Sequence, residues 1–357
     1  MGFSPTNYID SNEKVKKFVH KVSENTEAER KKVWTEHARY NRENVKKYGW
    51  SCDTFFGQGK GKTTIIIGAS PALSLQLDKL RELQKDSDVV LVGISAGIRY
   101  LLQNGIKPDY TFISDSSNKM TQWFDGIEDT TGMTLCADIM ANPKAVQMWI
   151  DRGGDVKYHA VYSAIEKLDK KVEKWYEPIN GEGYFLPSLS SQYNTAVAWA
   201  FQVLASEVLI FVGNELSFPS NDTAKDKYYP DRTDEKDTWI RRPHIDIYGK
   251  KVWTSFMLYQ MKLVLEDYLG KVSAAGWFFN ATEAGIFGVT KDGPVPWIRQ
   301  FTLDMAIRQA KSIIYRGHPI TSSLVQPTAQ QIYQYTGATA PFLGGNHVRL
   351  QRTLPFV

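Results

Sequence analysis

The sequence predicts an α/β protein: a doubly wound, mostly parallel Rossmann-like sheet, with an N-terminal helical arm and a C-terminal helix plus an extended tail. Two features indicate this class. Short continuous runs of β-branched and aliphatic residues alternate with amphipathic segments in the middle of the chain, as expected for parallel strands buried on both faces. The first 60 residues are instead rich in Lys, Glu, Arg and Asn. We therefore expect an arm over residues 1–60, a Rossmann-like domain over 61–290, and a helix and tail over 291–357.

The arm reads as one or two helices. Val15, Phe18 and Val22 fall on one helical face, and Val33 and Trp34 could start a second helix. Its charge run fits a solvated helix face. A basic arm that docks on a partner is the more specific alternative. Both interpretations stay open at this point.

The middle of the chain alternates strand and helix signals in a regular order. The expected strands are residues 63–69, 88–95, 108–115, 134–139, 155–163 and 207–216. The expected helices between and after them are residues 70–86, 96–106, 142–153, 192–205 and 252–271, with a polar loop over 217–250. An apolar segment at 275–288 precedes the last helix, 297–317, and a tail rich in Pro, Thr, Gln and Gly.

Composition limits the kinds of protein this chain can be. A net charge of +4 is too small to indicate nucleic-acid binding. Two cysteines cannot build a disulfide framework or a cysteine-based zinc site, so a reducing compartment is the simpler reading. The sequence has no run of about 18 apolar residues, and its first residues lack the apolar core of a signal peptide. We expect a cytoplasmic protein that does not bind a membrane.

The turn after the first strand is the first candidate ligand site. In doubly wound sheets, ligands bind beyond the carboxyl ends of the strands, where the strand order reverses. Lys62 lies at the amino end of its strand, and Phe56 stands where an ATPase phosphate loop needs glycine, so such a loop is disfavoured. In "GASPAL", Gly68 would allow close backbone approach, and the N–H groups from Ser70 to Leu73 would face an anion. A phosphate cradle and an ordinary strand-to-helix turn remain equal alternatives.

Three stretches carry a resemblance to a known family. Residues 65–115, "IIIGASPALS" to "PDYTFISD", resemble a strand, a G-x-G/S-P-S-L turn, a helix and a strand that close with G-I-x-P-D-Y…D. "LPSLSSQYNTAVAWAFQVLASEVLIFVGNELSF" is similar to a pattern of small residues, a helix, and a strand ending G-x-D-L-A-[FY]. "FFNATEAGIFG" looks like that family's N-A-T-E-G-G…G segment. The family joins flagellar motility accessory factors with archaeal 6-hydroxymethylpterin diphosphokinases, and its core is similar to that of bacterial sialyltransferases.

The resemblance implies two chemistries. Motility accessory factors are thought to transfer nonulosonic acid sugars from CMP donors to flagellin hydroxyls. The diphosphokinases use ATP and Mg²⁺, which call for clustered carboxylates. Here the third strand ends at Asp115 without a second carboxylate nearby, which departs from the diphosphokinase pattern. Further departures are Ala72 for Ser, Glu215 for Asp and Ala284 for Gly.

The resemblance also implies a set of nucleotide-contacting residues in the 61–290 domain. They are Gly68, Ala69, Ser70 and Pro71 at the phosphate or ribose; Ser95 and Asp115 at neighbouring strand ends; Asn194 and Thr195 on a helix facing the nucleotide; Asn214, Glu215 and Ser217 on the sugar side; and Asn280, Thr282 and Glu283 at the cytidine end.

Catalysis would then need a base and an anion stabiliser. Tyrosine hydroxyls can stabilise the charge that builds on the departing phosphate without a metal, and Tyr228 and Tyr229 are the candidates. His244 is the candidate base for the acceptor hydroxyl, with a surface histidine as the alternative. Arg241 and Arg242 could bind a sugar carboxylate or be solvated loop charges.

Three functions follow from these residues. The first is a glycosyltransferase-like protein with a CMP-sugar donor, a hydroxyl acceptor that includes proteins, and no required cofactor. The second is a diphosphokinase that uses ATP and Mg²⁺. The third is a non-catalytic nucleotide-binding or assembly module, in which the arm or the tail contacts a partner or a second copy of the chain.

Overall fold

A computed structural model describes residues 13–161, 186–187, 189, 191–223, 225–226, 228–229, 240–290 and 293–316, with side chains from residue 30 onward. Its centre is an eight-stranded sheet in the order β12-β9-β6-β1-β2-β3-β4-β5. Every neighbouring pair in this sheet is parallel. The predicted α/β class with a mostly parallel sheet is therefore confirmed.

The strands are short and mostly buried, as the continuous apolar runs predict. Their bounds are β1 Thr63–Ile67, β2 Val89–Ile94, β3 Tyr110–Ile113, β4 Thr134–Asp138, β5 Asp155–His159, β6 Val208–Val212, β9 Trp277–Asn280 and β12 Ile298–Gln300. Two small two-stranded sheets lie apart from it: β7 Arg241–Ile245 with β8 Lys251–Ser255, and β10 Val289–Thr290 with β11 Gly293–Pro294.

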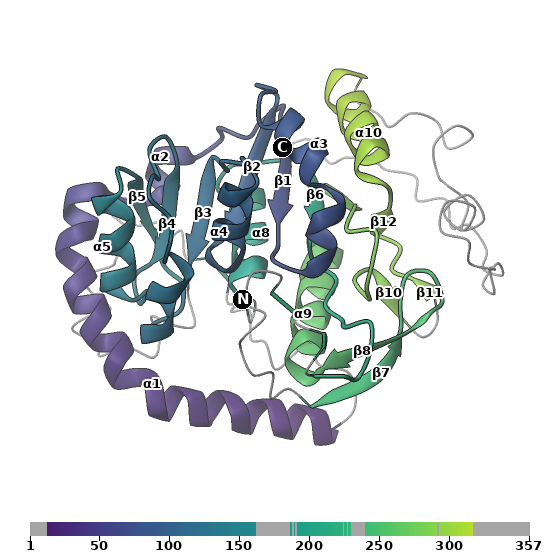
Figure 1. Cartoon of the computed structure of the whole chain (residues 1–357), viewed down its shortest axis with the longest axis horizontal. Helices are drawn as coiled ribbons and strands as arrows, with labels where there is room; N and C mark the ends of the chain where they lie inside the picture. Colours follow the sequence, from purple (N-terminus) through teal and green to yellow (C-terminus); the bar gives the residue numbers. More distant parts are fainter. Residues whose placement is uncertain are drawn as a thin grey trace.

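Helices cover both faces of the sheet (Figure 1). One apolar cluster joins the strands to α3 Leu77–Leu83, α4 Ser95–Gln103 and α10 Leu303–Arg316. The larger cluster joins them to α5 Pro143–Asp151, α8 Gln192–Gln202 and α9 Phe256–Val272. Each face is thus sealed by residues from distant parts of the chain, as in other doubly wound sheets.

The arm forms one long helix, α1 Glu13–Tyr48, followed by α2 Ser51–Phe55. Figure 1 shows α1 running along the β5 edge of the sheet and continuing beneath the carboxyl ends of the strands. Asn41, fully buried, donates its amide hydrogens to the carbonyl oxygens of Ile139 at 2.9 Å and Ala141 at 3.1 Å. Trp34 donates to the Ser116 hydroxyl at 3.1 Å. The second half of α1 is therefore attached to the loops that follow β3 and β4.

Several local predictions differ from the structure. The expected helix 70–86 begins as a 3₁₀ turn, η2 Pro71–Leu75, and only then becomes α3; Ser70 precedes η2 without a side-chain cap. A second 3₁₀ turn, η3 Asn118–Trp123, follows β3. The start of the expected helix 252–271 is strand β8, the expected polar loop contains β7, and β12 occupies the start of the expected helix 297–317.

The chain beyond residue 290 packs on the sheet rather than apart from it. β12 pairs with β9, and α10 covers one face of β6 and β1. The predicted tail, 317–357, lies outside the described residues, as does the end of the expected strand 155–163. Within the described part of the chain, no helix has the length and apolar character that crossing a membrane requires.

Candidate functional site

The strand order reverses between β1 and β6. From β1 the chain adds β2 to β5 on one side, then returns to add β6, β9 and β12 on the other. Gly68 and Gly213 end these two central strands in close contact: a Cβ on Gly68 would lie 2.1 Å from the Gly213 carbonyl oxygen. Gly213 has a φ of 62°, a backbone conformation that favours glycine. The Gly68 position therefore needs glycine because two strand ends meet there.

Glu215 occupies the position predicted for a phosphate. Its carboxyl accepts the Ala72 N–H and contacts the Ser70 hydroxyl. Its own N–H donates to Ser70 Oγ at 3.3 Å. Burial raises the pKa of Glu215 to about 7, since the charged form is poorly solvated there. A phosphate charge 4 Å from the ionised carboxylate would be repelled by about 4 kcal/mol at an effective dielectric constant of about 20.

The phosphate cradle at Gly68–Pro71 stays a prediction, and the contacts of its turn do not favour it. The first amide of its turn is taken by a carboxyl of the same chain, and the turn is a short 3₁₀ segment rather than the start of an α-helix. Ser70 is fully buried, and its N–H donates to the Gly213 carbonyl at 3.1 Å. Ala69 is buried in the core beside these contacts.

The segment after β9 joins the same strand ends. The Asn214 N–H donates to Thr282 Oγ1 at 3.2 Å, and the Gln76 amide donates to the Thr282 carbonyl at 3.4 Å. Asn280 donates to Phe287 and Gln300 and accepts the Thr282 N–H. The predicted set Ser70, Asn214, Glu215 and Thr282, which we call the switch-point cluster, is therefore brought together from three strand ends.

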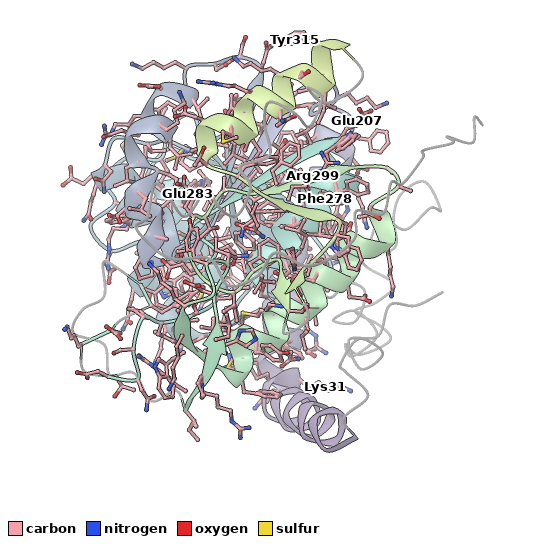
Figure 2. The ribbon with its side chains drawn as sticks, turned by 90° about the vertical axis from the view of Figure 1, so that its right-hand side faces the viewer. Lys31, Glu207, Phe278, Glu283, Arg299 and Tyr315 are labelled. Carbon is pink, nitrogen blue, oxygen red and sulfur yellow. The ribbon has the colours of Figure 1, made fainter. Side chains whose placement is uncertain are left out.

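Two non-glycine residues near this cluster have left-handed backbones, Leu216 at φ 55° and Glu283 at φ 60°. Such positions cost about 1–2 kcal/mol and persist where surrounding contacts hold them. The Glu283 carboxyl accepts the Leu303 N–H at the start of α10, at 3.3 Å. In Figure 2, Glu283 lies to the left of Glu207 and lower; Glu283 follows β9, whereas Glu207 precedes β6. Glu283 thus links the cluster to α10.

Both candidate tyrosines lie near the cluster. The Tyr228 and Tyr229 rings are 5.3 Å apart, and Tyr228 packs on Phe218 at 5.6 Å. Tyr228 interacts electrostatically with Glu215, and burial raises its pKa well above the ordinary value. Tyr229 instead packs on Trp123, at 5.9 Å. Of the two candidate tyrosines, Tyr228 is therefore the one that interacts with Glu215.

Six other predicted residues lie in structural positions. The Asn194 amide donates to the carbonyls of Leu189 and Met261, and Thr195 Oγ1 donates to the Ser191 carbonyl. Ser95 pairs with the Gln192 amide at 3.0 Å. The Asp115 carboxyl accepts the Ser117 N–H at 2.7 Å and lies 3.4 Å from Arg30. Ser217 is buried, and Pro71 begins η2.

His244 lies on β7, outside the main sheet. Its ring packs 5.5 Å from Tyr259, and Nδ1 is 2.8 Å from both the N and O atoms of Ile245. Burial lowers its pKa, so the imidazole is neutral near pH 7. Only the tautomer that donates to the Ile245 carbonyl leaves Nε2 free to accept a proton. Its role as the base stays a prediction.

Arg241 holds a loop together. Its guanidinium lies 3.7 Å from the centre of the Phe218 ring and donates to the carbonyls of Ser220 at 2.9 Å and Asp226 at 2.7 Å. Its side chain is fully buried, with the Asp226 carboxylate at 3.8 Å. These contacts engage the guanidinium that the sequence left as a candidate for binding a sugar carboxylate.

Sequence reasoning missed one buried pair at the same edge of the sheet. Asp138 ends β4 and His159 ends β5, in register with each other, and their Oδ2 and Nε2 atoms are 3.8 Å apart. Burial raises the pKa of Asp138 to about 7 and lowers the pKa of His159 to about 3. Neither His159 ring nitrogen has a hydrogen-bond partner in the described part of the chain. The sequence placed both residues inside expected strands, 134–139 and 155–163, and gave no signal that they meet.

No cluster of three or more His, Cys, Asp or Glu side chains suited to a metal ion occurs among the described residues.

The fold and the switch-point cluster define an α/β protein with a buried polar site where the strand order reverses. A model of the family described as 6-hydroxymethylpterin diphosphokinase MptE-like matches residues 39–221, more than half of the chain. The chain belongs to this MptE-like family, and the resemblance stated from the sequence is confirmed.

Two other comparisons complete this result. The solved structure of the MAf glycosyltransferase from Magnetospirillum magneticum AMB-1 is similar to this chain, with a TM-score of 0.49 and 15% identity over 76% of this chain. The match covers 43% of that protein, so this chain spans less than half of its length. No curated protein sequence matches this chain.

Proposed function

We propose that this chain is a glycosyltransferase-like protein that binds a CMP-activated sugar at the switch-point cluster and transfers the sugar to a hydroxyl acceptor. The observation that carries the proposal is the meeting of Ser70, Glu215 and Thr282 from three strand ends, with Tyr228 against them. Ligands of doubly wound sheets bind at this place. The donor would be a nonulosonic acid linked to CMP, and the acceptor a protein or small-molecule hydroxyl.

Tyr228 supports the chemistry. When CMP leaves, negative charge builds on a phosphate oxygen, and a buried hydroxyl donor stabilises that charge in a site with little water. The pKa of Tyr228 lies well above its ordinary value, so the phenol keeps its proton at neutral pH and can donate it in a hydrogen bond. This arrangement requires no metal, which is why we propose a reaction without a cofactor.

The family description favours a second candidate, a diphosphokinase that transfers diphosphate from ATP with Mg²⁺ to a pterin-like alcohol. Such a reaction needs carboxylates around the metal. At the strand ends of the main sheet, the buried carboxyls among the described residues are Glu215, which follows β6, and Asp138, which ends β4; β1, β2 and β3 separate these two strands. This spacing ranks the diphosphokinase second.

Thermal unfolding with ligands tests both candidates. A ligand that binds only the folded state raises the melting temperature. We expect CMP and CDP to raise the melting temperature without metal. Tyr228→Phe should reduce sugar transfer more than it reduces the rise in melting temperature that CMP produces. A rise only with ATP and Mg²⁺ would favour the diphosphokinase. The absence of any rise would favour the non-catalytic module.

A further inference from the structure

We infer that Glu215 determines specificity by accepting hydrogen bonds from the 2′- and 3′-hydroxyl groups of a ribose, so that the ribose and not the phosphate lies at the turn after β1. This inference rests on the proposed function, because it requires that a nucleotide bind at the switch-point cluster. It replaces the phosphate cradle predicted there with a site for a neutral diol.

The Glu215 backbone is held by its neighbours, and its carboxyl contacts the Ala72 N–H and the Ser70 hydroxyl. Gly213 and Leu216, on either side of it, both have positive φ, at 62° and 55°. The Glu215 carbonyl accepts the Ile286 N–H at 2.8 Å. Gly285 packs so tightly on Glu215 that a Cβ there would lie 2.0 Å from the Glu215 carbonyl oxygen. A ligand must therefore fit against this carboxyl rather than displace it.

The carboxyl can still accept further hydrogen bonds. A carboxylate offers about four lone-pair positions, and Glu215 uses its contacts with the Ala72 N–H and the Ser70 hydroxyl. Both contacts come from the same turn, and each fixes the orientation of the carboxyl. These two contacts leave the carboxyl able to accept further hydrogen bonds from a ligand.

The chemistry of those positions selects the ligand group. A phosphate carries negative charge and acceptor atoms, so an ionised carboxylate repels it. A ribose diol carries no charge and supplies two O–H donors. Acidic residues at strand ends of dinucleotide-binding sheets hold ribose hydroxyls in this way. Glu215 comes from β6, so the comparison is one of chemistry and not of position.

Comparison of CMP with 2′-deoxy-CMP tests the inference on the full chain. At pH 8, where Glu215 is largely ionised, we expect calorimetry to show CMP binding about tenfold tighter than 2′-deoxy-CMP, since a hydrogen bond to a charged group contributes about that much. Glu215→Gln should weaken CMP and reduce the ratio between the two nucleotides to about twofold or less. Glu207→Gln is the matched control: it is exposed, precedes the same strand, and should leave both affinities unchanged.

Each other outcome has a defined meaning. Equal binding of the two nucleotides by the unaltered chain would overturn the inference while leaving the proposed function in place. Tighter binding of CMP or of inorganic phosphate by Glu215→Gln would also overturn it, because Glu215 would then be an obstacle to the phosphate. Failure of the unaltered chain to bind any nucleotide removes the proposed function and the inference with it. If Glu215→Gln does not fold, equal binding of the two nucleotides by the unaltered chain would still overturn the inference.

Discussion

Asp138 and His159 are two buried residues whose opposite pKa shifts should leave almost no net effect on the pH dependence of stability. Burial disfavours the charged form of each, so the acid keeps its proton to a higher pH and the imidazole loses its proton at a lower pH. Between about pH 4 and 6.5 the folded pair therefore holds one proton, on the aspartate, and the unfolded pair also holds one, on the histidine. The two pH effects on stability nearly cancel.

Single substitutions should expose the two effects. In Asp138→Asn the remaining His159, with a pKa of about 3 against an ordinary 6.5, binds its proton only in the unfolded state between those values. Stability should therefore rise with pH there, by about 1.4 kcal/mol per unit relative to the unaltered chain. In His159→Gln the remaining Asp138, with a pKa of about 7 against 3.8, should make stability fall with rising pH over that range by a similar slope. Urea unfolding from pH 4 to 7 measures both, and parallel curves for all three proteins would contradict the assignment.

The sequence predicted the elements better than the contacts between them. The apolar runs of β1, β2 and β6 could be read directly because each strand is buried on both faces. β7 was missed because its residues, "RRPHI", are mostly exposed and polar and include a proline. Contacts between strands depend on strand register, which the sequence does not show. Asp138 meets His159 only because β4 and β5 pair in parallel.

For the site too, the residues could be predicted from the sequence but their contacts could not. Ser70, Asn214, Glu215 and Thr282 could be named from the turns that follow strands, since parallel strands end at one edge. The role of Glu215 could not be read from the sequence, because the bond from the Ala72 N–H joins positions 143 residues apart. Asn194 is another such case, since its amide bonds to Met261 on α9 rather than facing a ligand.

Attachment of α1 is a property of one element and gives a second prediction. Asn41→Ala removes both amide hydrogen bonds to the loop after β4 and leaves two buried carbonyls without that donor. We expect a loss of about 1–3 kcal/mol in the free energy of unfolding. Arg39→Ala, two residues earlier on the exposed side of α1, is the control and should change stability by less than about 0.5 kcal/mol. Equal effects of the two substitutions would mean that Asn41 does not hold α1.

At the scale of the whole molecule, the family match and the folded unit have different bounds. The match ends at residue 221, but β9 and β12 extend the sheet beyond β6, and α9 and α10 cover its faces. Thr282 also belongs to this later part. The polar site and the core are therefore completed by chain that lies outside the match.

A chain limited to residues 39–221 should for this reason fail to fold. Its β6 residues are all fully buried in the intact protein, yet the shortened chain would expose them at a sheet edge, where unpaired strands promote aggregation. It would also lose the cover that α10 gives β6 and β1. A chain of residues 30–316 keeps every one of these contacts and serves as the control. We expect near-ultraviolet circular dichroism and amide dispersion typical of a packed core for the control alone, and a native-like spectrum from residues 39–221 would show that the later strands and helices are dispensable for folding.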